Sequence, residues 1–265
     1  MLSLIILYLN FAERRFGAIN LNRNHESRIE MASILAISAH PDDETLFAGG
    51  TLAMYAAKGH RVFILETTRG QGGEVGEPPL TTRKNLAAFR EQEVRKAAQV
   101  LGVEDIFFLP YVDPYMEING IARRIDVPLT DFAAAINEYI KKLQPDMIIT
   151  HGSNGEYGHP QHIHTHQAAR MALSNGHPEI AFLSWCAWYE PSERERILNK
   201  DDRADIINDI TPWHAIKVIA ALCHRTQHAM FLRNSGTRSV PEMVWKTETF
   251  HIWQGPLPAE LLNQR

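Results

Sequence analysis

From residue 31 onward, short runs of apolar residues alternate along the chain with longer stretches in which apolar residues recur every three or four positions. The short runs are typical of buried strands, and the periodic stretches are typical of amphipathic helices. This alternation predicts βαβ units, in which parallel strands form a sheet covered by helices. We therefore expect an α/β fold, a three-layer α/β/α sandwich with a mostly parallel, Rossmann-like sheet. The expected strands are 33–38, 62–66, 106–109, 147–150, 180–189 and 244–252, and the expected helices are 44–58, 82–101, 129–143, 160–174 and 213–227.

The first 30 residues do not follow this alternation. Residues 2–11 are apolar, but this run is too short to cross a bilayer as a helix, which takes about 20 residues. An export signal carries its positive charge before the apolar run, whereas two arginines follow it here. We expect residues 1–30 to be an appendage, or to lie upstream of a natural start at Met31. Residues 31–265 are expected to form a single domain.

Composition excludes several classes of protein. The chain has 265 residues, a formal net charge of -4 at pH 7 and a pI near 6.4, and its basic residues do not cluster among aromatic ones. This argues against a nucleic-acid partner, which needs a broad positive surface. Two cysteines, Cys186 and Cys223, form neither a disulfide framework nor a cysteine-rich zinc site, so any metal must be held by histidine and carboxylate. We expect a cytoplasmic location and no membrane partner.

Chemically active residues concentrate first at Ala39-His40-Pro41-Asp42-Asp43-Glu44, directly after the first expected strand. In α/β proteins, ligands bind beyond the carboxyl ends of the strands. His40 and Asp43 are three residues apart, a spacing that lets a strand-to-helix turn aim both at one metal ion. Asp42 is then left as a candidate general base.

A second cluster occupies residues 157–166, Tyr-Gly-His-Pro-Gln-His-Ile-His-Thr-His, and follows the expected strand 147–150. Parallel strands would open both clusters onto the same edge of the sheet, giving His40, Asp43 and one histidine as a three-ligand set. Two histidines and one carboxylate suit a catalytic zinc that keeps one position open for water. A lone histidine at a helix start is more often a cap or a packed side chain, but two clusters at strand ends favour a site.

Together the two motifs resemble the signatures of the LmbE-like, or PIG-L, family of zinc-dependent N-acetylglucosaminyl deacetylases. Ala-His-Pro-Asp-Asp-Glu at 39–44 and Gly-His-Pro-x-His-x-x-x-His at 158–166 occur in the family's order. The segment His224-Arg225-Thr226-Gln227 is similar to the family's late His-x-Ser/Thr-Gln element. The resemblance extends from about Met31 to this segment, and it implies the LmbE-like deacetylase fold.

Position by position, the resemblance implies that His40, Asp43 and His162 hold one zinc ion, or another divalent transition metal. Asp42 would be the general base. His159 would be the catalytic histidine, which stabilises the oxyanion and protonates the leaving amine. Tyr157 would add a hydrogen bond to the oxyanion.

Three further residues are assigned on weaker grounds. The resemblance places Arg69 at a position that contacts substrate. His224 is expected either to line the same pocket or to pack on the sheet. Glu44 is expected either to cap the first helix or to support the metal ligands.

One residue departs from the family pattern. The family usually has aspartate between the proline and the metal-binding histidine, where this chain has Gln161. Glutamine can orient the His159 imidazole by a hydrogen bond but brings no negative charge, so we expect a lower pKa of His159 than in a typical member. A shifted pH optimum or a reduced activity is the expected consequence.

The leading hypothesis is a metal-dependent hydrolase that removes the N-acetyl group from a small-molecule amino sugar or its conjugate, of the N-acetylglucosamine type. An amidase for a different N-acyl substrate stays open, since the zinc and base residues specify the bond that is broken and not the group around it. A metal-binding family member of low activity is the second alternative. The resemblance also implies a homo-oligomer, a trimer or a hexamer.

Overall fold

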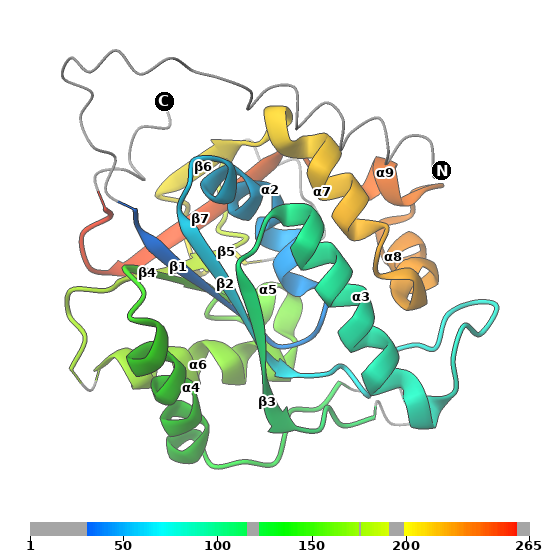
Figure 1. Ribbon diagram of the computed structural model, residues 1–265, viewed down its shortest axis with the longest axis horizontal. Helices are drawn as coiled ribbons and strands as arrows, with labels where there is room; N and C mark the ends of the chain where they lie inside the picture. Colours follow the sequence, from blue (N-terminus) through cyan, green and yellow to red (C-terminus); the bar gives the residue numbers. More distant parts are fainter. Residues whose placement is uncertain (1–30, 116–121, 175, 191–198, 259–265) are drawn as a thin grey trace. The chain divides into compact units, whose positions relative to one another are not determined.

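A computed structural model describes residues 31–115, 122–174, 176–190 and 199–258 (Figure 1). These residues belong to one compact unit that begins at Met31. The expected appendage, residues 1–30, lies outside the described residues, and its nature stays a prediction. Within the described ranges, no helix combines the length and apolar character needed to cross a membrane.

The centre of the described fold is a seven-stranded sheet in the order β3-β2-β1-β4-β5-β7-β6. The first five strands in this order pair in parallel, whereas β7 runs antiparallel to both β5 and β6. The prediction of a mostly parallel sheet is confirmed, with an antiparallel pair added at one edge. The strands are β1 (Ser33–Ser38), β2 (Arg61–Thr68), β3 (Asp105–Tyr111), β4 (Met147–Thr150), β5 (Ala181–Trp185), β6 (Ile206–Asp209) and β7 (Thr247–Gln254).

Helices cover both faces of this sheet (Figure 1). Helices α2, α3 and α7 pack together on one face, and α4 packs against α6 on the other, which gives the expected three layers. The helices are α2 (Asp43–Ala57), α3 (Leu86–Leu101), α4 (Leu129–Leu143), α5 (Gly155–Gly158), α6 (Pro160–Ser174), α7 (His214–Ala221), α8 (His228–Ser235) and α9 (Val240–Met243), with short 3-10 turns at η1 (Arg83–Asn85), η2 (Thr211–Trp213) and η3 (Arg225–Gln227).

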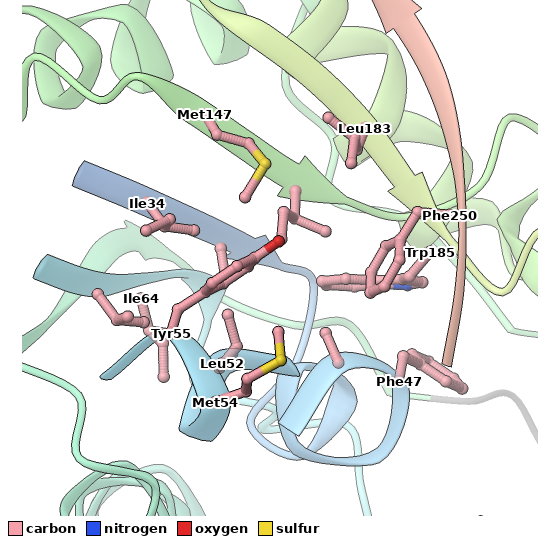
Figure 2. Close-up of a cluster of buried hydrophobic side chains, with 14 of the residues drawn as sticks. Ile34, Phe47, Leu52, Met54, Tyr55, Ile64, Met147, Leu183, Trp185 and Phe250 are labelled. Carbon is pink, nitrogen blue, oxygen red and sulfur yellow. The ribbon is translucent and has the colours of Figure 1, made fainter. Parts of the chain in front are cut away.

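Strand β1 shows why both helical layers are present. Successive side chains of a strand point to opposite faces of its sheet. Ile34 and Ala36 are buried in one hydrophobic cluster with side chains of α2 and α3, and Leu35 and Ile37 are buried in another with side chains of α4 and α6. Figure 2 shows the first cluster, where Tyr55 of α2 lies among the strand residues. An unbroken apolar run is what a strand buried on both faces requires.

The later expected elements differ from the observed ones. The strand expected over 180–189 ends at Trp185, where Cys186 takes a φ of 61° that a strand cannot accommodate. The helix expected over 213–227 ends at Ala221, and the chain continues in the separate turn η3. Strand β6 was not expected, because it is a short edge strand with little apolar periodicity. In contrast, the expected boundaries 33–38, 129–143, 147–150 and 160–174 are those of the structure.

The order of the strands places the carboxyl ends of β1 and β4 side by side. Strand β1 pairs with β2 on one side and with β4 on the other, in a register that sets Ile37 opposite Thr150. The chain has therefore crossed to the other side of β1 between β3 and β4. At such a switch point the loops leave in opposite directions and open a crevice. Both histidine-containing motifs follow strands that end at this crevice.

A buried ion pair joins the antiparallel edge to the helical layer. The Glu248 carboxylate on β7 lies 2.7 Å from Lys217 Nζ on α7, and both side chains are fully buried. The same carboxylate accepts hydrogen bonds from the backbone N–H groups of Gly50 (2.9 Å) and Thr51 (2.7 Å) in α2. Glu248 therefore fixes α2, the helix that begins with the first motif, to the sheet.

Replacing Glu248 with alanine is expected to lower the free energy of unfolding by about 3–5 kcal/mol, because it leaves the Lys217 ammonium buried without its carboxylate. Urea unfolding of the two proteins measures the difference. Arg61→Ala is a matched control, since it removes an ion pair with Glu104 (2.8 Å) that is exposed to solvent and should contribute little. A loss for Glu248→Ala as small as that of the control would contradict the prediction.

Candidate functional site

The turn between β1 and α2 aims His40 and Asp43 at one point. The Asp43 amide donates to the His40 carbonyl (3.2 Å), and the His40 amide donates to the Asp43 carboxylate (2.9 Å). Asp42, between them, has a φ of 134° and a ψ of -27°, a conformation that residues with a side chain rarely adopt. The turn brings His40 Nδ1 within 3.3 Å of Asp43 Oδ2.

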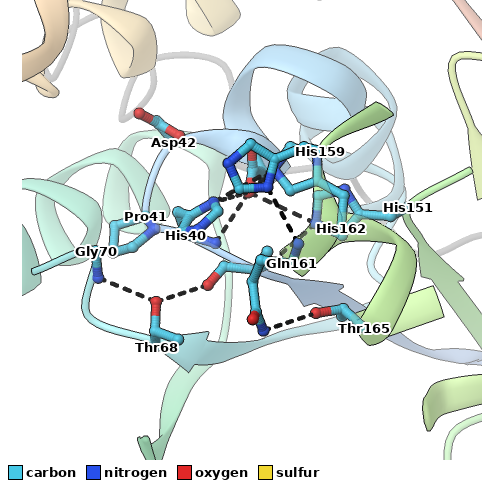
Figure 3. Close-up of polar contacts among 12 residues, drawn as sticks. His40, Pro41, Asp42, Thr68, Gly70, His151, His159, Gln161, His162 and Thr165 are labelled. Carbon is cyan, nitrogen blue, oxygen red and sulfur yellow. Dashed lines mark hydrogen bonds and ion pairs between the residues drawn. The ribbon is translucent and has the colours of Figure 1, made fainter. Parts of the chain in front are cut away.

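His162, in the first turn of α6, completes a cluster of three donor atoms (Figure 3). Its Nε2 lies 3.3 Å from His40 Nδ1 and 3.5 Å from Asp43 Oδ2. Bonds of about 2.0–2.1 Å to a tetrahedral zinc ion separate neighbouring donor atoms by roughly 3.3–3.4 Å. The separations among these three atoms therefore fit an ion of this kind. The structure brings together the three residues that the resemblance implied as ligands.

Two other histidines lie close to these donor atoms. Each forms a further group of three residues whose donor atoms, one per residue, all lie within 4.8 Å of one another. These groups are His40, His159 and His162, and Asp43, His151 and His162. His151 has no lone pair free for a metal, because its Nε2 accepts the Ala39 N–H (2.9 Å) and its Nδ1 faces Glu156 Oε2 (3.0 Å). It is a supporting residue of the β4 end and not a fourth ligand.

His162 and His40 each have a carboxylate on the ring nitrogen that faces away from the cluster. Glu156 Oε2 lies 2.6 Å from His162 Nδ1, and Asp113 Oδ1 lies 3.3 Å from His40 Nε2. Carboxylates in this position fix the orientation of metal-binding histidines. Sequence reasoning gave neither carboxylate a role. Both lie in loops that follow strands β4 and β3, and that placement was the available signal.

These carboxylates also set the pKa values of the cluster. Burial lowers the pKa of His40, but Asp113 and Asp43 raise it more, to about 10. Burial raises the pKa of Glu156, but His151 and His162 lower it more, to about 2. A metal ion bound at His40 Nδ1 would therefore have to displace a proton, and its binding would weaken at low pH.

Asp42 is held by Arg90, a residue that sequence reasoning missed. The Arg90 guanidinium donates to Asp42 Oδ2 (3.0 Å) and to the carbonyl oxygens of Pro41 (2.5 Å) and Gly70 (2.9 Å). A Cβ at Gly70, whose φ is 62°, would lie 2.1 Å from Arg90 Nη1, so the loop can follow the guanidinium only with glycine there. Burial raises the pKa of Asp42 well above its usual range, the Arg90 charge opposes this, and neighbouring carboxylates add to it.

The sequence carried a signal for Arg90. The apolar stripe of the expected helix 82–101 includes Leu86 and Val94, and Arg90 lies four residues from each, on the same face. A charged side chain on the core-facing side of a helix requires a buried partner. In the structure Arg90 is 3% exposed, and the partner is Asp42.

His159 stacks on His162, with ring centroids 4.3 Å apart. Its Nδ1 accepts a hydrogen bond from the Gln161 backbone N–H (3.3 Å), so Nε2 carries the proton of the neutral imidazole. Burial lowers the pKa of His159, and the neighbouring imidazoles of His162 and His40 lower it further, to about 2.

The Gln161 side chain does not make the expected hydrogen bond to His159. It is fully buried, its Oε1 accepts the Ile125 N–H (2.7 Å) and its Nε2 donates to Thr165 (3.5 Å), as Figure 3 shows for the latter. The expectation that this side chain orients the imidazole is wrong. The first turn of α6 directs the side chain away from His159, and only the backbone of Gln161 contacts the ring.

A cavity of about 510 Å³ opens over these groups. Asp42, His159 and Tyr157 line it, and Tyr157 is 56% exposed. His40 and Asp43 line the same cavity, so two of the donor residues, a carboxylate, an imidazole and a phenol lie at it together. Such a set can bind a metal ion, take a proton from water and stabilise negative charge on a substrate oxygen.

Arg69 and His224 do not line this cavity, which corrects both predicted substrate contacts. Arg69 Nε pairs with Glu91 (2.8 Å), and its guanidinium lies 4.8 Å from the ring centroid of Phe108, because the side chain leaves the end of β2 toward the edge strand β3. His224 is fully buried, and its Nε2 lies 3.2 Å from the Thr45 hydroxyl of α2. It packs in the interior, which is the second of the two expectations for this residue.

Arg90 and Gln227 lie on the cavity wall instead. Gln227 donates from Nε2 to the Glu74 carbonyl (2.9 Å), so it also holds the loop after β2 at the cavity. Glu44 contacts the turn that carries His40 and Asp43. Its Oε2 accepts the Asp42 N–H (3.1 Å).

Comparisons with known proteins agree with the fold and the motifs. The family model described as GlcNAc-PI de-N-acetylase matches residues 35–173. A 1D-myo-inositol 2-acetamido-2-deoxy-alpha-D-glucopyranoside deacetylase from Mycolicibacterium vanbaalenii is 28% identical over 232 residues, which cover 75% of this chain and 82% of the relative.

Two solved structures share the fold. The N,N'-diacetylchitobiose deacetylase from Pyrococcus horikoshii superposes with a TM-score of 0.61 at 21% identity, covering 85% of each chain. The 4-carboxy-2-hydroxymuconate hydratase from Pseudomonas putida superposes with a TM-score of 0.58 at 20% identity, covering 86% of this chain and 98% of the other. Because a deacetylase and a hydratase share this fold, the reaction must be argued from the site.

The segment matched by the family model spans more than half of the chain and contains both motifs, from β1 through the end of α6. The predicted fold and the predicted family are both confirmed. This chain belongs to the GlcNAc-PI de-N-acetylase, or PIG-L, family.

Proposed function

We propose that this protein is a zinc-dependent hydrolase that removes the N-acetyl group from an amino sugar or an amino-sugar conjugate of the N-acetylglucosamine type. The observation that carries the proposal is the triangle of His40 Nδ1, Asp43 Oδ2 and His162 Nε2, with sides of 3.3, 3.3 and 3.5 Å, beside the unliganded carboxylate of Asp42. The family, described as a GlcNAc-PI de-N-acetylase, and the Mycolicibacterium relative, a deacetylase of an acetamido sugar, support the choice of substrate.

The ligand set is the one that suits zinc in hydrolases, two histidines and one carboxylate with a position left open. When bound, zinc lowers the pKa of a water molecule toward 7 and polarises the acetamide carbonyl. Asp42 takes the proton of the attacking water. Burial and nearby carboxylates raise the pKa of Asp42, which favours proton uptake, and Arg90 keeps the carboxylate in place.

His159 and Tyr157 act on the carbonyl oxygen of the substrate. Since His159 Nδ1 accepts the Gln161 N–H, its Nε2–H donates to the negative charge that develops on that oxygen. The Tyr157 hydroxyl donates a second hydrogen bond. A neutral imidazole is a poor source of the final proton, so Asp42 passes the proton it has taken up to the leaving amine. This assigns to Asp42 the acid step that the resemblance gave to His159.

Asp42→Asn is expected to lower kcat for acetate release by about 10²–10⁴-fold, because the proton acceptor is lost. Zinc content should stay that of the wild type, because Asp42 is not a ligand. Acetate release from N-acetylglucosamine conjugates and metal analysis of the purified proteins measure the two effects. Asp146→Asn is a control, since this carboxylate accepts the Ser33 N–H (2.7 Å) at the opposite end of the sheet. Wild-type turnover by Asp42→Asn would overturn the assignment.

Removing metal with a chelator is expected to abolish acetate release, and adding zinc is expected to restore it, because the nucleophile depends on the ion. His162→Ala should bind zinc far more weakly than the wild type. His164→Ala should not, since His164 contacts Arg124 and the Val127 carbonyl and not the donor cluster. Acetate release that survives complete metal removal would exclude the proposal. Release of other acyl groups, with acetamido sugars left intact, would favour the amidase alternative.

Gln161→Asp is expected to lower the free energy of unfolding by about 1–3 kcal/mol, because the shorter carboxylate loses the Ile125 hydrogen bond at a fully buried position. Any displacement of the pH profile of kcat/KM should be toward higher pH, because a carboxylate at position 161 acts on His159 through its charge and raises the imidazole pKa. Thermal unfolding and the pH profile test both statements. Gln167→Asp, at an exposed position of α6, is the control. An unchanged free energy of unfolding, or a profile displaced toward lower pH, would contradict the prediction.

A further inference from the structure

Glu156 occupies a backbone conformation that its side chain must stabilise. Its φ is 63° and its ψ is -55°, in a loop where the flanking Gly155 also has a positive φ, of 68°. Non-glycine residues in such regions cost of order 1–3 kcal/mol and persist where the surrounding structure holds them. The Glu156 side chain is fully buried. Its contacts therefore have to offset both the backbone strain and the burial of a carboxylate.

Both oxygens of the Glu156 carboxylate act as acceptors. Oε1 accepts the Gly152 N–H (2.6 Å), and Oε2 lies 3.0 Å from His151 Nδ1 and 2.6 Å from His162 Nδ1. One oxygen is thus shared by two imidazoles, whose rings stack with centroids 4.0 Å apart. One of these imidazoles belongs to a ligand residue, and the other belongs to the end of β4.

The positions of the protons follow from this chain of contacts. The Ala39 N–H can only donate, so His151 Nε2 is an acceptor and His151 Nδ1 carries the proton toward Glu156. An ionised carboxylate can only accept, so His162 Nδ1 also carries a proton. The lone pair of His162 then lies on Nε2, the atom that faces His40 and Asp43.

We propose that Glu156 is a positioning residue for the metal site, which fixes the tautomer and ring orientation of His162 and thereby raises zinc affinity. The inference rests on the proposed function insofar as His162 is taken as a zinc ligand. It also bears on position 161, where this chain has glutamine in place of the family's usual aspartate. The chain lacks a carboxylate at position 161 for His159, but it places the buried carboxylate of Glu156, six residues before His162, on the neighbouring ligand histidine.

Glu156→Gln is the direct test. An amide has one acceptor oxygen where the carboxylate uses two, so glutamine must lose the bond from Gly152 or those from the two histidines. We expect zinc affinity, measured by competition with a chromophoric chelator in the absence of substrate, to fall by about 10–100-fold. The increase in melting temperature caused by zinc should shrink accordingly.

Asp202→Asn is the matched control. Asp202 is also a fully buried carboxylate that holds the loop after β4, through the Ser153 N–H (2.7 Å) and the Ser184 hydroxyl (3.0 Å), but it contacts none of the donor residues. It should lower the melting temperatures of the metal-free and zinc-loaded proteins equally and leave zinc affinity unchanged. Wild-type zinc affinity in folded Glu156→Gln, or an equal affinity loss in both variants, would overturn the proposal.

A measurement on the wild type covers the case in which Glu156→Gln does not fold. Long-range ¹H–¹⁵N spectra of the histidine rings report which nitrogen carries the proton. We expect His162 protonated at Nδ1 in the metal-free protein, with Nε2 shifting when zinc is added. Protonation of His162 at Nε2 alone would overturn the proposal. Neither measurement uses substrate. Acetate release by the wild type tests the proposed deacetylation separately, so a failure of that function is distinguished from a failure of the role of Glu156.

Discussion

The parallel pairing of β1 with β4 is the constraint on which the site depends. The two strands are 113 residues apart at Ile37 and Thr150, yet they lie in register, and Thr150 donates its hydroxyl to the Ile37 carbonyl (2.7 Å). Because both strands end at the same level, the Asp43 turn and the His151 loop leave the sheet next to each other. A slip of one residue would turn every side chain of the strand to the opposite face and separate the donor atoms.

Burial of so many ionisable groups at one point requires that each be paired. An isolated buried charge is very costly, and the cost is reduced only when a partner and further hydrogen bonds are present. Asp42 has Arg90, Asp113 has His40, and Glu156 has two histidines and a backbone N–H. The pairs also hold geometry, since Arg90 binds the Pro41 carbonyl after β1 and the Gly70 carbonyl after β2, and Glu44 binds the Asp42 amide. The same contacts that allow the charges to be buried therefore hold the proposed catalytic groups in place.

The proposed chemistry follows from a division of roles within one short turn. His40 and Asp43 point their donor atoms at a common position, whereas the unusual backbone of Asp42 directs its carboxylate to Arg90 and away from that position. The shared fold of a deacetylase and a hydratase shows that the scaffold does not choose the reaction. In this chain the choice rests on the side chains around the crevice. Gln161 is one of these residues: its backbone N–H donates to His159, and its side-chain oxygen accepts the Ile125 N–H.

Local pattern was sufficient for most of the fold and for the centre of the site. The apolar run of β1 and the periodicity of α4 give their boundaries directly, because strand and helix periods depend on neighbouring residues only. The motif at 39–44 likewise identified the ligand turn. Arg90, Asp113 and Glu156 could not be assigned in this way, since each acts on a residue distant in the chain or across a strained loop. Arg69 shows the reverse error: its position beside a strand end was correct, but the direction of its side chain depended on packing against β3. The sequence by itself shows which residues are chemically competent. Strand order, register and burial decide which of them meet, because contacts between distant segments exist only once the sheet has formed.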